Sequence, residues 1–273
     1  MVTLCVQNLC LVIGEDCNLN CLHCLRGKKT KKVMTDQVIE ETFNQIKIVH
    51  NLNICGGEPT LLIERLQKAI EVIVQKRIIV ENISVTINGT IYSKKLINLA
   101  KYFVRHSNHR GLKRNNFKIY ISLDKYHYFE VQRLGLYKQY CTNLDKYEKS
   151  RFFGGYRALD YNLYNEGNAR YLNEPKEEFI PHLPIITYAG FKGIEDKENG
   201  VCNIGPLVTI STEGIVTEDN VSFENQETIY NYGSIFKDRI DNILIRNGAK
   251  IVLPQEFDEE NSKILTKILE NKK

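Results

Sequence analysis

The chain has 273 residues, of which 42% are hydrophobic and 26% are charged, and its formal net charge is +4. These values are ordinary for a globular protein, and the charge is too small to indicate nucleic-acid binding by itself. No stretch approaches the ~20 consecutive apolar residues of a membrane span, and the N-terminus lacks the cationic start and cleavage site of a signal peptide, so we expect a cytoplasmic protein.

The first half of the chain alternates strand-like and helix-like patterns. Thr35 is a candidate N-cap for the first helix. This rhythm is typical of parallel βαβ units, and it predicts an α/β protein built as a whole or partial barrel. The predicted segments, strand and helix in turn, are 8–14, 35–49, 51–55, 61–76, 81–88, 93–106 and 117–123.

The pattern is weaker in the second half. The segment LVTISTEGIVTED has two β segments around a turn at Glu213 and Gly214, which predicts a hairpin. We therefore divide the chain into a core barrel, residues 1–200, and a small C-terminal extension, residues 201–273. Other expected elements are a helix within 126–149, strands near 156–164 and 183–189, a polar helix at 258–271 and a solvated basic loop at 106–118.

Three of the eight cysteines, Cys17, Cys21 and Cys24, follow the first predicted strand directly. Thiolates are soft ligands that suit iron–sulfur clusters and zinc. In the reducing cytosol, clustered cysteines bind metal more often than they form disulfides. A [4Fe–4S] cube has four irons that each need an external ligand, so three cysteines leave one iron free for a small molecule. The carboxyl end of a strand is also where the active sites of α/β barrels lie. The spacing therefore predicts a reactive cluster.

Four motifs stand in order at the carboxyl ends of the predicted strands. C-x3-C-x2-C is followed by ICGGEPTL (54–61), TINGT (86–90) and ISLD (121–124). In these motifs the chain resembles the radical S-adenosylmethionine (radical SAM) enzymes, whose signature is C-x3-C-x2-C after a first strand. The resemblance covers residues 10–125 and implies a partial (β/α)6-type radical SAM barrel with a small C-terminal β-hairpin and helix extension.

The resemblance also implies cofactors and a chemistry. One [4Fe–4S] cluster would be held by Cys17, Cys21 and Cys24, with S-adenosylmethionine on the open iron. Reductive cleavage of that cofactor would give a 5′-deoxyadenosyl radical that abstracts hydrogen from a substrate, while the protein positions and shields the reacting groups. An electron donor such as flavodoxin or ferredoxin would supply the electron.

The GGEP segment is predicted to bind S-adenosylmethionine. Gly56 and Gly57 allow the backbone to approach a ligand closely. Backbone carbonyls and the Glu58 carboxylate are acceptors that suit the amino group of the cofactor. The structural alternative is a strand-to-helix turn in which Pro59 begins the next helix. Both interpretations can hold together.

Residues after the third and fourth strands are further candidates for cofactor binding. Asn88 precedes Gly89, and this pair also forms common turns. Ser122 and Asp124 alternate on one side of a strand, from which they would reach the ribose or the methionine carboxylate. The alternative for Asp124 is an N-cap of the following helix.

Two histidines and one short motif are weaker signals. His23 lies beside the last cysteine of the loop and is expected to pack against the adenine or to take part in chemistry. His127 is expected to be an ordinary exposed histidine. The segment GNAR (167–170) resembles a Gly-x-Ala segment that lies near the cofactor in some radical SAM barrels. No catalytic side chain is assigned.

The remaining cysteines are Cys5, Cys10, Cys55, Cys141 and Cys202, which we expect to be buried free thiols. Residues 202–236 resemble the SPASM or twitch extension of some relatives, but no cysteine follows Cys202. We therefore expect a degenerate extension without a cluster, and leave open whether Cys141 or Cys202 binds an auxiliary one.

Alternatives remain for both the class and the substrate. A structural zinc protein would close a tetrahedron around the three loop cysteines with a fourth ligand such as Cys55. A nucleic-acid binder would use the basic stretch 106–118 and would lose affinity with rising salt. Resemblance to the SPASM-type extension favours a peptide or protein substrate, by analogy alone, and a small molecule is the main alternative.

Overall fold

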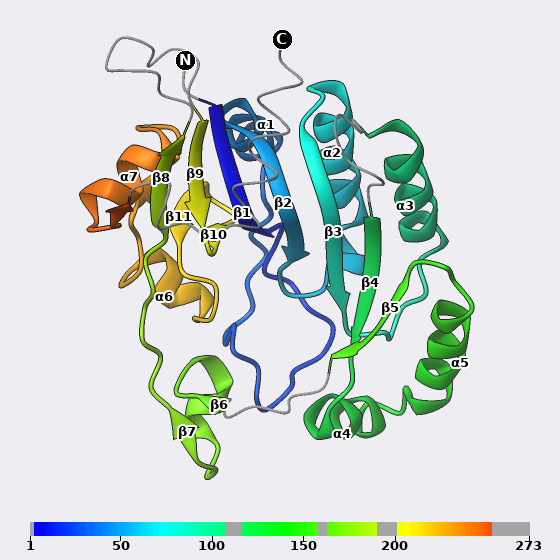
Figure 1. Cartoon of the computed structure of the whole chain (residues 1–273). Helices are drawn as coiled ribbons and strands as arrows, with labels where there is room; N and C mark the ends of the chain where they lie inside the picture. Colours follow the sequence, from blue (N-terminus) through cyan, green and yellow to red (C-terminus); the bar gives the residue numbers. More distant parts are fainter. Residues whose placement is uncertain (1–2, 108–115, 158–162, 190–200, 253–273) are drawn as a thin grey trace, which may run out of the picture.

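The computed structural model describes residues 3–107, 116–157, 163–189 and 201–252. Its centre is a mostly parallel β-sheet (Figure 1). Five strands lie side by side in chain order, all parallel, which confirms the predicted α/β partial barrel. They are β1 (Thr3–Val12), β2 (Ile46–Cys55), β3 (Ile79–Ile87), β4 (Asn116–Ser122) and β5 (Phe153–Arg157).

Three helices cover one face of this sheet (Figure 1). They are α1 (Asp36–Gln45), α2 (Ile63–Gln75), which follows the 3-10 turn η1 (Pro59–Leu62), and α3 (Lys94–His106). Thr35 and Ser93 cap α1 and α3 by accepting a backbone N–H, as predicted for Thr35. Alternate strand residues such as Leu9, Leu11 and Leu52 are fully buried on this face. The opposite face, called the inner face below, carries the residues between them.

The predicted helix 35–49 is wrong in its last four residues. The helix ends at Gln45, and β2 begins at Ile46. The stretch Ile46–Val49 contains three β-branched residues, which favour a strand. Pairing with β1 along the whole of β2 outweighs the helical spacing of this short segment.

The predicted helical region 126–149 is confirmed as two helices, α4 (Lys125–Arg133) and α5 (Tyr137–Glu148). Gly135 separates them with a φ of 69°, a conformation that favours glycine. Small elements follow, and one of them, β8, confirms the strand expected near 183–189. They are β6 (Leu163–Tyr164), η2 (Gly167–Tyr171), β7 (Lys176–Glu177) and β8 (Ile185–Ala189).

The C-terminal segment joins the same sheet. β9 (Val201–Gly205) and β10 (Val208–Ile210) pair in parallel with successive parts of β1, on the side opposite β2. The predicted hairpin is confirmed: β10 and β11 (Ile215–Thr217) are antiparallel, and Gly214 in their turn has a φ of 76°. The division at residue 200 stays a prediction. The remaining elements are α6 (Phe223–Glu227), β12 (Gly233–Ser234), α7 (Ile240–Arg246) and β13 (Ile251–Val252).

Some predicted segments lie outside the described residues. These are the polar helix 258–271, most of the basic stretch 106–118 and the middle of the strand expected near 156–164. Within the described part of the chain, no helix is both long and apolar enough to cross a membrane.

Candidate functional site

The cysteine loop leaves β1 at the carboxyl end of the sheet (Figure 1). Cys21 is buried, and Cys17 and Cys24 are half-buried. All three pack in one apolar cluster with Leu19 and Tyr140. The N–H of Cys24 donates to the carbonyl of Cys21 at 3.1 Å, so the second half of the loop is a tight turn. The loop therefore places its three cysteines beside one apolar cluster.

The two glycines of the GGEP segment touch the start of this loop. The N–H of Gly57 donates to Gly14 O at 2.9 Å, and that of Glu58 donates to Asp16 O at 2.8 Å. A Cβ on Gly57 would lie 2.0 Å from Asp16 O, and one on Gly56 would lie 2.3 Å from Gly14 O. The glycines are needed because two backbones meet here. Their contact with S-adenosylmethionine stays a prediction.

Glu58 links the GGEP turn to the end of β3. Its buried carboxylate accepts from the N–H and hydroxyl of Thr60, at 3.0 and 2.6 Å, and from the N–H of Asn88 at 2.7 Å. Burial raises the pKa of Glu58 in spite of these hydrogen bonds. Pro59 begins η1, so the turn that the sequence offered as an alternative is present.

Asn88 joins this turn to the cysteine loop. Its side-chain amide donates to Asn18 Oδ1 at 2.8 Å and lies 3.9 Å from the sulfur of Cys17. Its Oδ1 accepts from the N–H and hydroxyl of Thr90. The Asn18 amide donates to the same Thr90 hydroxyl at 2.8 Å. Asn88 is thus a positioning residue for the loop.

Asn168 contacts the cysteine loop, and we did not predict this contact. Its N–H donates to Cys24 O at 2.8 Å, and its side-chain amide donates to Cys21 O at 3.2 Å. A Cβ on neighbouring Gly167, whose φ is 53°, would lie 2.4 Å from Cys24 O. The weak GNAR signal therefore marked a segment that braces the cysteine loop.

Asp124 is the N-cap of α4, the structural alternative given for it. Its Oδ1 accepts from the N–H groups of Tyr126 and His127, and its Oδ2 lies 2.5 Å from His127 Nδ1. Burial alone would raise the pKa of Asp124, but the hydrogen bond and charge of His127 lower it to about 2. Ser122, the last residue of β4, accepts from Tyr140 through its carbonyl at 3.3 Å. Cofactor contacts of both residues stay predictions.

His23 stacks on Tyr126, with ring centroids 4.6 Å apart, and its Nε2 lies 3.6 Å from Asp124 Oδ2. Burial lowers the pKa of His23 to about 4, although Asp124 acts in the opposite direction. His127 is only 15% exposed, so the expectation of an exposed histidine is wrong. Cys21, His23 and His127 each bring one ligand atom within 4.8 Å of the others. The two histidines therefore lie beside a predicted cluster ligand.

The thiols of the loop fit a metal cluster. Burial raises the pKa of Cys17 to about 11, and burial together with Cys24 and Cys17 raises the pKa of Cys21 further. Such thiols become thiolates when a metal compensates their charge. The sulfur of Cys17 accepts a hydrogen bond from the N–H of Leu19 at 3.5 Å and lies 3.9 Å from the side-chain amide of Asn88. Hydrogen bonds of this kind to sulfur tune iron–sulfur centres.

The other cysteines differ in exposure. Cys5, Cys10 and Cys202 are buried as expected, but Cys55 is half-buried and Cys141 is exposed, so that part of the prediction is wrong. The sulfur of Cys55 lies 3.2 Å from that of Cys10. Cys55 therefore has a partner outside the cysteine loop, which disfavours it as a fourth ligand there.

Comparisons with known proteins support the resemblance. The model of the Radical SAM superfamily matches residues 11–110, less than half of the chain, and confirms the resemblance over that range. None of the curated proteins compared with the chain matches it.

A comparison with solved structures gives matches of low identity. The structure of anSMEcpe with bound AdoMet and Cp18Cys peptide is 15% identical, with a TM-score of 0.45, and the match covers 87% of this chain and 80% of that one. Streptococcus suis SuiB bound to its precursor peptide SuiA is 12% identical, with a TM-score of 0.42, and the match covers 88% of this chain and 64% of SuiB. The chain thus spans less than two thirds of SuiB. These likenesses are too distant to assign an activity or a substrate.

Proposed function

We propose that this chain, which matches the Radical SAM superfamily over residues 11–110, is an enzyme that cleaves S-adenosylmethionine reductively. The proposal rests on one observation: hydrogen bonds join the cysteine loop, the GGEP turn and the end of β3 in the structure. The three-cysteine loop is hydrogen-bonded to the GGEP turn through Gly57 and Glu58, and to the end of β3 through Asn88. A structural zinc site needs the cysteines alone and does not account for these contacts.

Cys17, Cys21 and Cys24 would hold one [4Fe–4S] cluster, and the open side would receive S-adenosylmethionine. When bound, these groups supply one-electron cleavage of the sulfonium to a 5′-deoxyadenosyl radical, which abstracts hydrogen from substrate. The protein's part is to bind and exclude water. We assign the cofactor contacts to the sequence-predicted set, now grouped at the carboxyl ends of β1–β4: Gly56, Gly57, Glu58, Pro59, Asn88, Ser122, Asp124 and His23.

The inner face of the sheet supports a peptide or protein segment as substrate. Asn8, Asn51 and Asn82 stand in register on β1, β2 and β3. The Asn51 amide donates to Asn8 Oδ1 at 2.9 Å, and the Asn82 amide donates to Asn51 Oδ1 at 3.0 Å. These groups line a hollow of about 380 Å³ with Lys118 and Arg157. Amide side chains both donate and accept, as a peptide backbone requires.

Anaerobic reconstitution with iron and sulfide tests the proposal. The wild-type chain is expected to turn brown, to hold four irons per chain and to form 5′-deoxyadenosine from S-adenosylmethionine when a low-potential reductant is added. Cys24→Ala is expected to abolish this product while leaving the circular dichroism spectrum unchanged. Cys141→Ser, which removes an exposed cysteine, is the matched control.

The same experiment decides between the classes. A colourless chain that holds one zinc, and loses it in Cys24→Ala, would support the structural zinc protein instead. Full product formation by Cys24→Ala would contradict the assignment of the cluster ligands.

The substrate class needs a separate measurement. A substrate that consumes the 5′-deoxyadenosyl radical removes it from the site, so we expect mixed peptides to raise the rate of 5′-deoxyadenosine formation when flavodoxin or ferredoxin supplies electrons. Asn51→Leu together with Asn82→Leu should reduce this stimulation. Stimulation by free amino acids, sugars or nucleosides, with none by peptides, would favour the small-molecule or nucleic-acid-component alternative.

A further inference from the structure

A second cluster of ligand atoms, which includes none of the three loop cysteines, lies on the inner face. Cys10 on β1, Cys55 at the end of β2 and Asp219 after β11 bring one ligand atom each within 4.8 Å of the others. Cys10 Sγ lies 3.2 Å from Cys55 Sγ and 3.4 Å from Asp219 Oδ1. These residues come from three separate parts of the chain, and only the folded structure brings them together.

Arg26 fixes the carboxylate beside the two sulfurs. Its guanidinium donates to Asp219 Oδ1 at 2.6 Å, to the Asp219 carbonyl, to Val221 O at 3.1 Å and to Cys55 Sγ at 3.6 Å. The side chain of Arg26 is only 14% exposed. The segment after β11 is thus pinned against β1 and β2 by a buried cation.

A disulfide does not suit this pair. Cys10 is opposite Asn53 in the parallel register, so Cys55 is one diagonal step away. Ordinary strand spacing puts the two α-carbons about 8 Å apart, beyond the reach of an unstrained disulfide. The sulfurs approach because both side chains point toward each other. Two thiolates on one tetrahedral zinc ion lie about 3.8 Å apart, so the two sulfurs would need to move apart only slightly to bind one ion.

The charges also suit a divalent ion. Two thiolates and one carboxylate carry three negative charges, and a buried group of that charge needs compensation. A divalent cation and the Arg26 guanidinium together supply three positive charges, so the filled site is neutral. Two sulfurs and one oxygen form a ligand set that zinc accepts.

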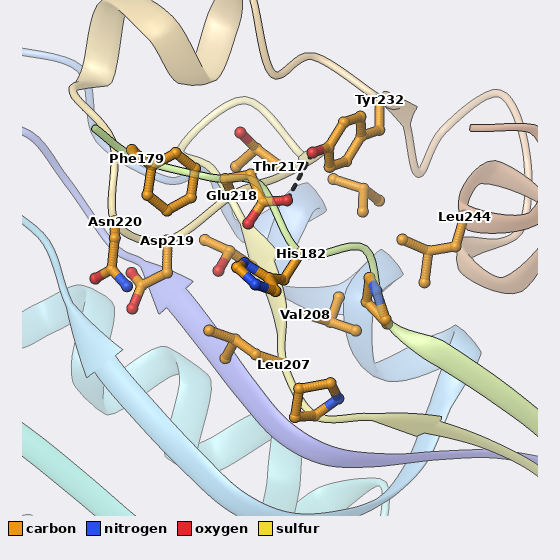
Figure 2. Close-up of a pocket in the computed structure, with 14 residues that line it drawn as sticks. Phe179, His182, Leu207, Val208, Thr217, Glu218, Asp219, Asn220, Tyr232 and Leu244 are labelled. Atoms are coloured by element: carbon orange, nitrogen blue, oxygen red, sulfur yellow. Dashed lines mark hydrogen bonds between the residues drawn. The ribbon is translucent and has the colours of Figure 1, made fainter. Parts of the chain in front are cut away.

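An independent observation lies on the neighbouring strand. Thr209 on β10 is opposite Cys10 in the register, on the same inner face. Its hydroxyl is buried and, within the part of the chain that the structure describes, has no hydrogen-bond partner. Thr209 and Asp219 both line a pocket of about 130 Å³, and Figure 2 shows Asp219 at one side of it, beside Asn220. That volume admits a few water molecules.

We propose that Cys10, Cys55 and Asp219 bind one zinc-like divalent cation, with a fourth position open to water from the pocket beside Thr209. On binding, each thiol that still carries a proton releases it to solvent, and no electron is transferred. A site with three protein ligands and an open position is the arrangement of reactive rather than structural zinc. The inference does not depend on the cluster proposed for the cysteine loop.

Zinc retention tests the site in the full chain. After anaerobic reconstitution of the cluster, addition of Zn²⁺ and dialysis against metal-free buffer, we expect one zinc per wild-type chain. Cys10→Ser and Cys55→Ser should each retain none, and Asp219→Asn should bind zinc about tenfold more weakly or worse. Cys5→Ala, which removes another buried cysteine of β1, should retain one zinc. Thermal unfolding of each variant identifies a loss that comes from misfolding.

A second variant separates the two metal sites. A chain in which Cys17, Cys21 and Cys24 are all replaced by alanine should still bind one Co²⁺, with a thiolate-to-cobalt absorption band that Cys55→Ser removes. Failure of this variant to form 5′-deoxyadenosine concerns the proposed function only. The proposed cation site is overturned if wild-type retains no zinc, if Cys10→Ser retains as much as wild-type, or if a mild oxidant joins Cys10 and Cys55 in a disulfide while zinc does not bind.

Discussion

The side-chain amide of Asn168 donates a hydrogen bond to the carbonyl oxygen of Cys21 at 3.2 Å, although 147 residues separate the two. The N–H of Asn168 donates to Cys24 as well. The late segment of the chain therefore holds the backbone between two predicted cluster ligands. This bracing adds to the hydrogen bonds that the loop makes within itself and with Asn88.

Asn168→Ala removes the side-chain hydrogen bond and keeps the backbone one. We expect the reconstituted variant to lose iron to a chelator about tenfold faster than wild-type, because residues that support metal ligands commonly contribute this much to metal retention. The decay of the cluster's visible absorbance measures the rate. Asn231→Ala, which changes an exposed asparagine elsewhere, should match wild-type. Equal rates in both variants would contradict the bracing role.

Gly57→Ala places a Cβ against the Asp16 carbonyl, where 2.0 Å is available. Backbone has to move on both sides, so we expect a loss of about 3 kcal/mol in the free energy of unfolding, the upper range for over-packing. Urea unfolding of the cluster-free chain measures it. Gly135→Asn is the control: Gly135 has a φ of 69° and no atom within 4 Å of an added Cβ, so a cost of about 1 kcal/mol or less is expected.

Glu58→Gln replaces a buried acceptor of three hydrogen bonds by a group that also donates. We expect a cost of about 1–3 kcal/mol in the free energy of unfolding at pH 5. Because the pKa of Glu58 is raised in the folded chain, the wild-type carboxyl contributes most stability below its unfolded pKa. That contribution is lost as the pH rises through the folded pKa. The stability difference between the two chains should therefore shrink between pH 4 and pH 7, and a difference that grows with pH would contradict the raised pKa.

Asp124 accepts from two N–H groups at the start of α4. Asp124→Ala should reduce the free energy of unfolding by about 1 kcal/mol, while Asp124→Asn should cost less because asparagine is an equally good N-cap. Urea unfolding of the two variants compares them. If S-adenosylmethionine binding by the reconstituted enzyme is weaker in both variants to the same extent, Asp124 contributes a charge to the cofactor site as well.

Local signals in the sequence predicted some elements and the Thr35 cap closely, whereas the strands expected at 8–14 and 51–55 begin earlier, at Thr3 and Ile46. The strand at 81–88 and the helix at 93–106 agree with β3 and α3 to within two residues, because hydrophobic spacing and the Ser93 cap act locally. The helix predicted at 35–49 ran too far, because the strand character of Ile46–Val49 depends on pairing with β1. A short stretch of sequence carries little information about such tertiary pairing.

The site was predicted in part for the same reason. The spacing of the cysteines and the GGEP motif in the sequence marked both as candidate site segments. In the structure, hydrogen bonds from Gly57 and Glu58 join the GGEP turn to the start of the cysteine loop. Contacts such as Asn168 with Cys21, or Cys10 with Asp219, join residues far apart in sequence. Such contacts depend on how distant segments pack in the folded chain, which no local sequence pattern encodes.

The asparagines on the inner face form a row with a direction. Asn82 donates to Asn51, Asn51 donates to Asn8, and Asn8 donates to the carbonyl of Pro206. Their dipoles are aligned head to tail, and each bond polarises the next. A ligand that extends this row at Asn82 meets the Oδ1 acceptor of Asn82, so it has to donate a hydrogen bond. A polypeptide bound there would therefore be selected by the direction in which its backbone N–H groups point.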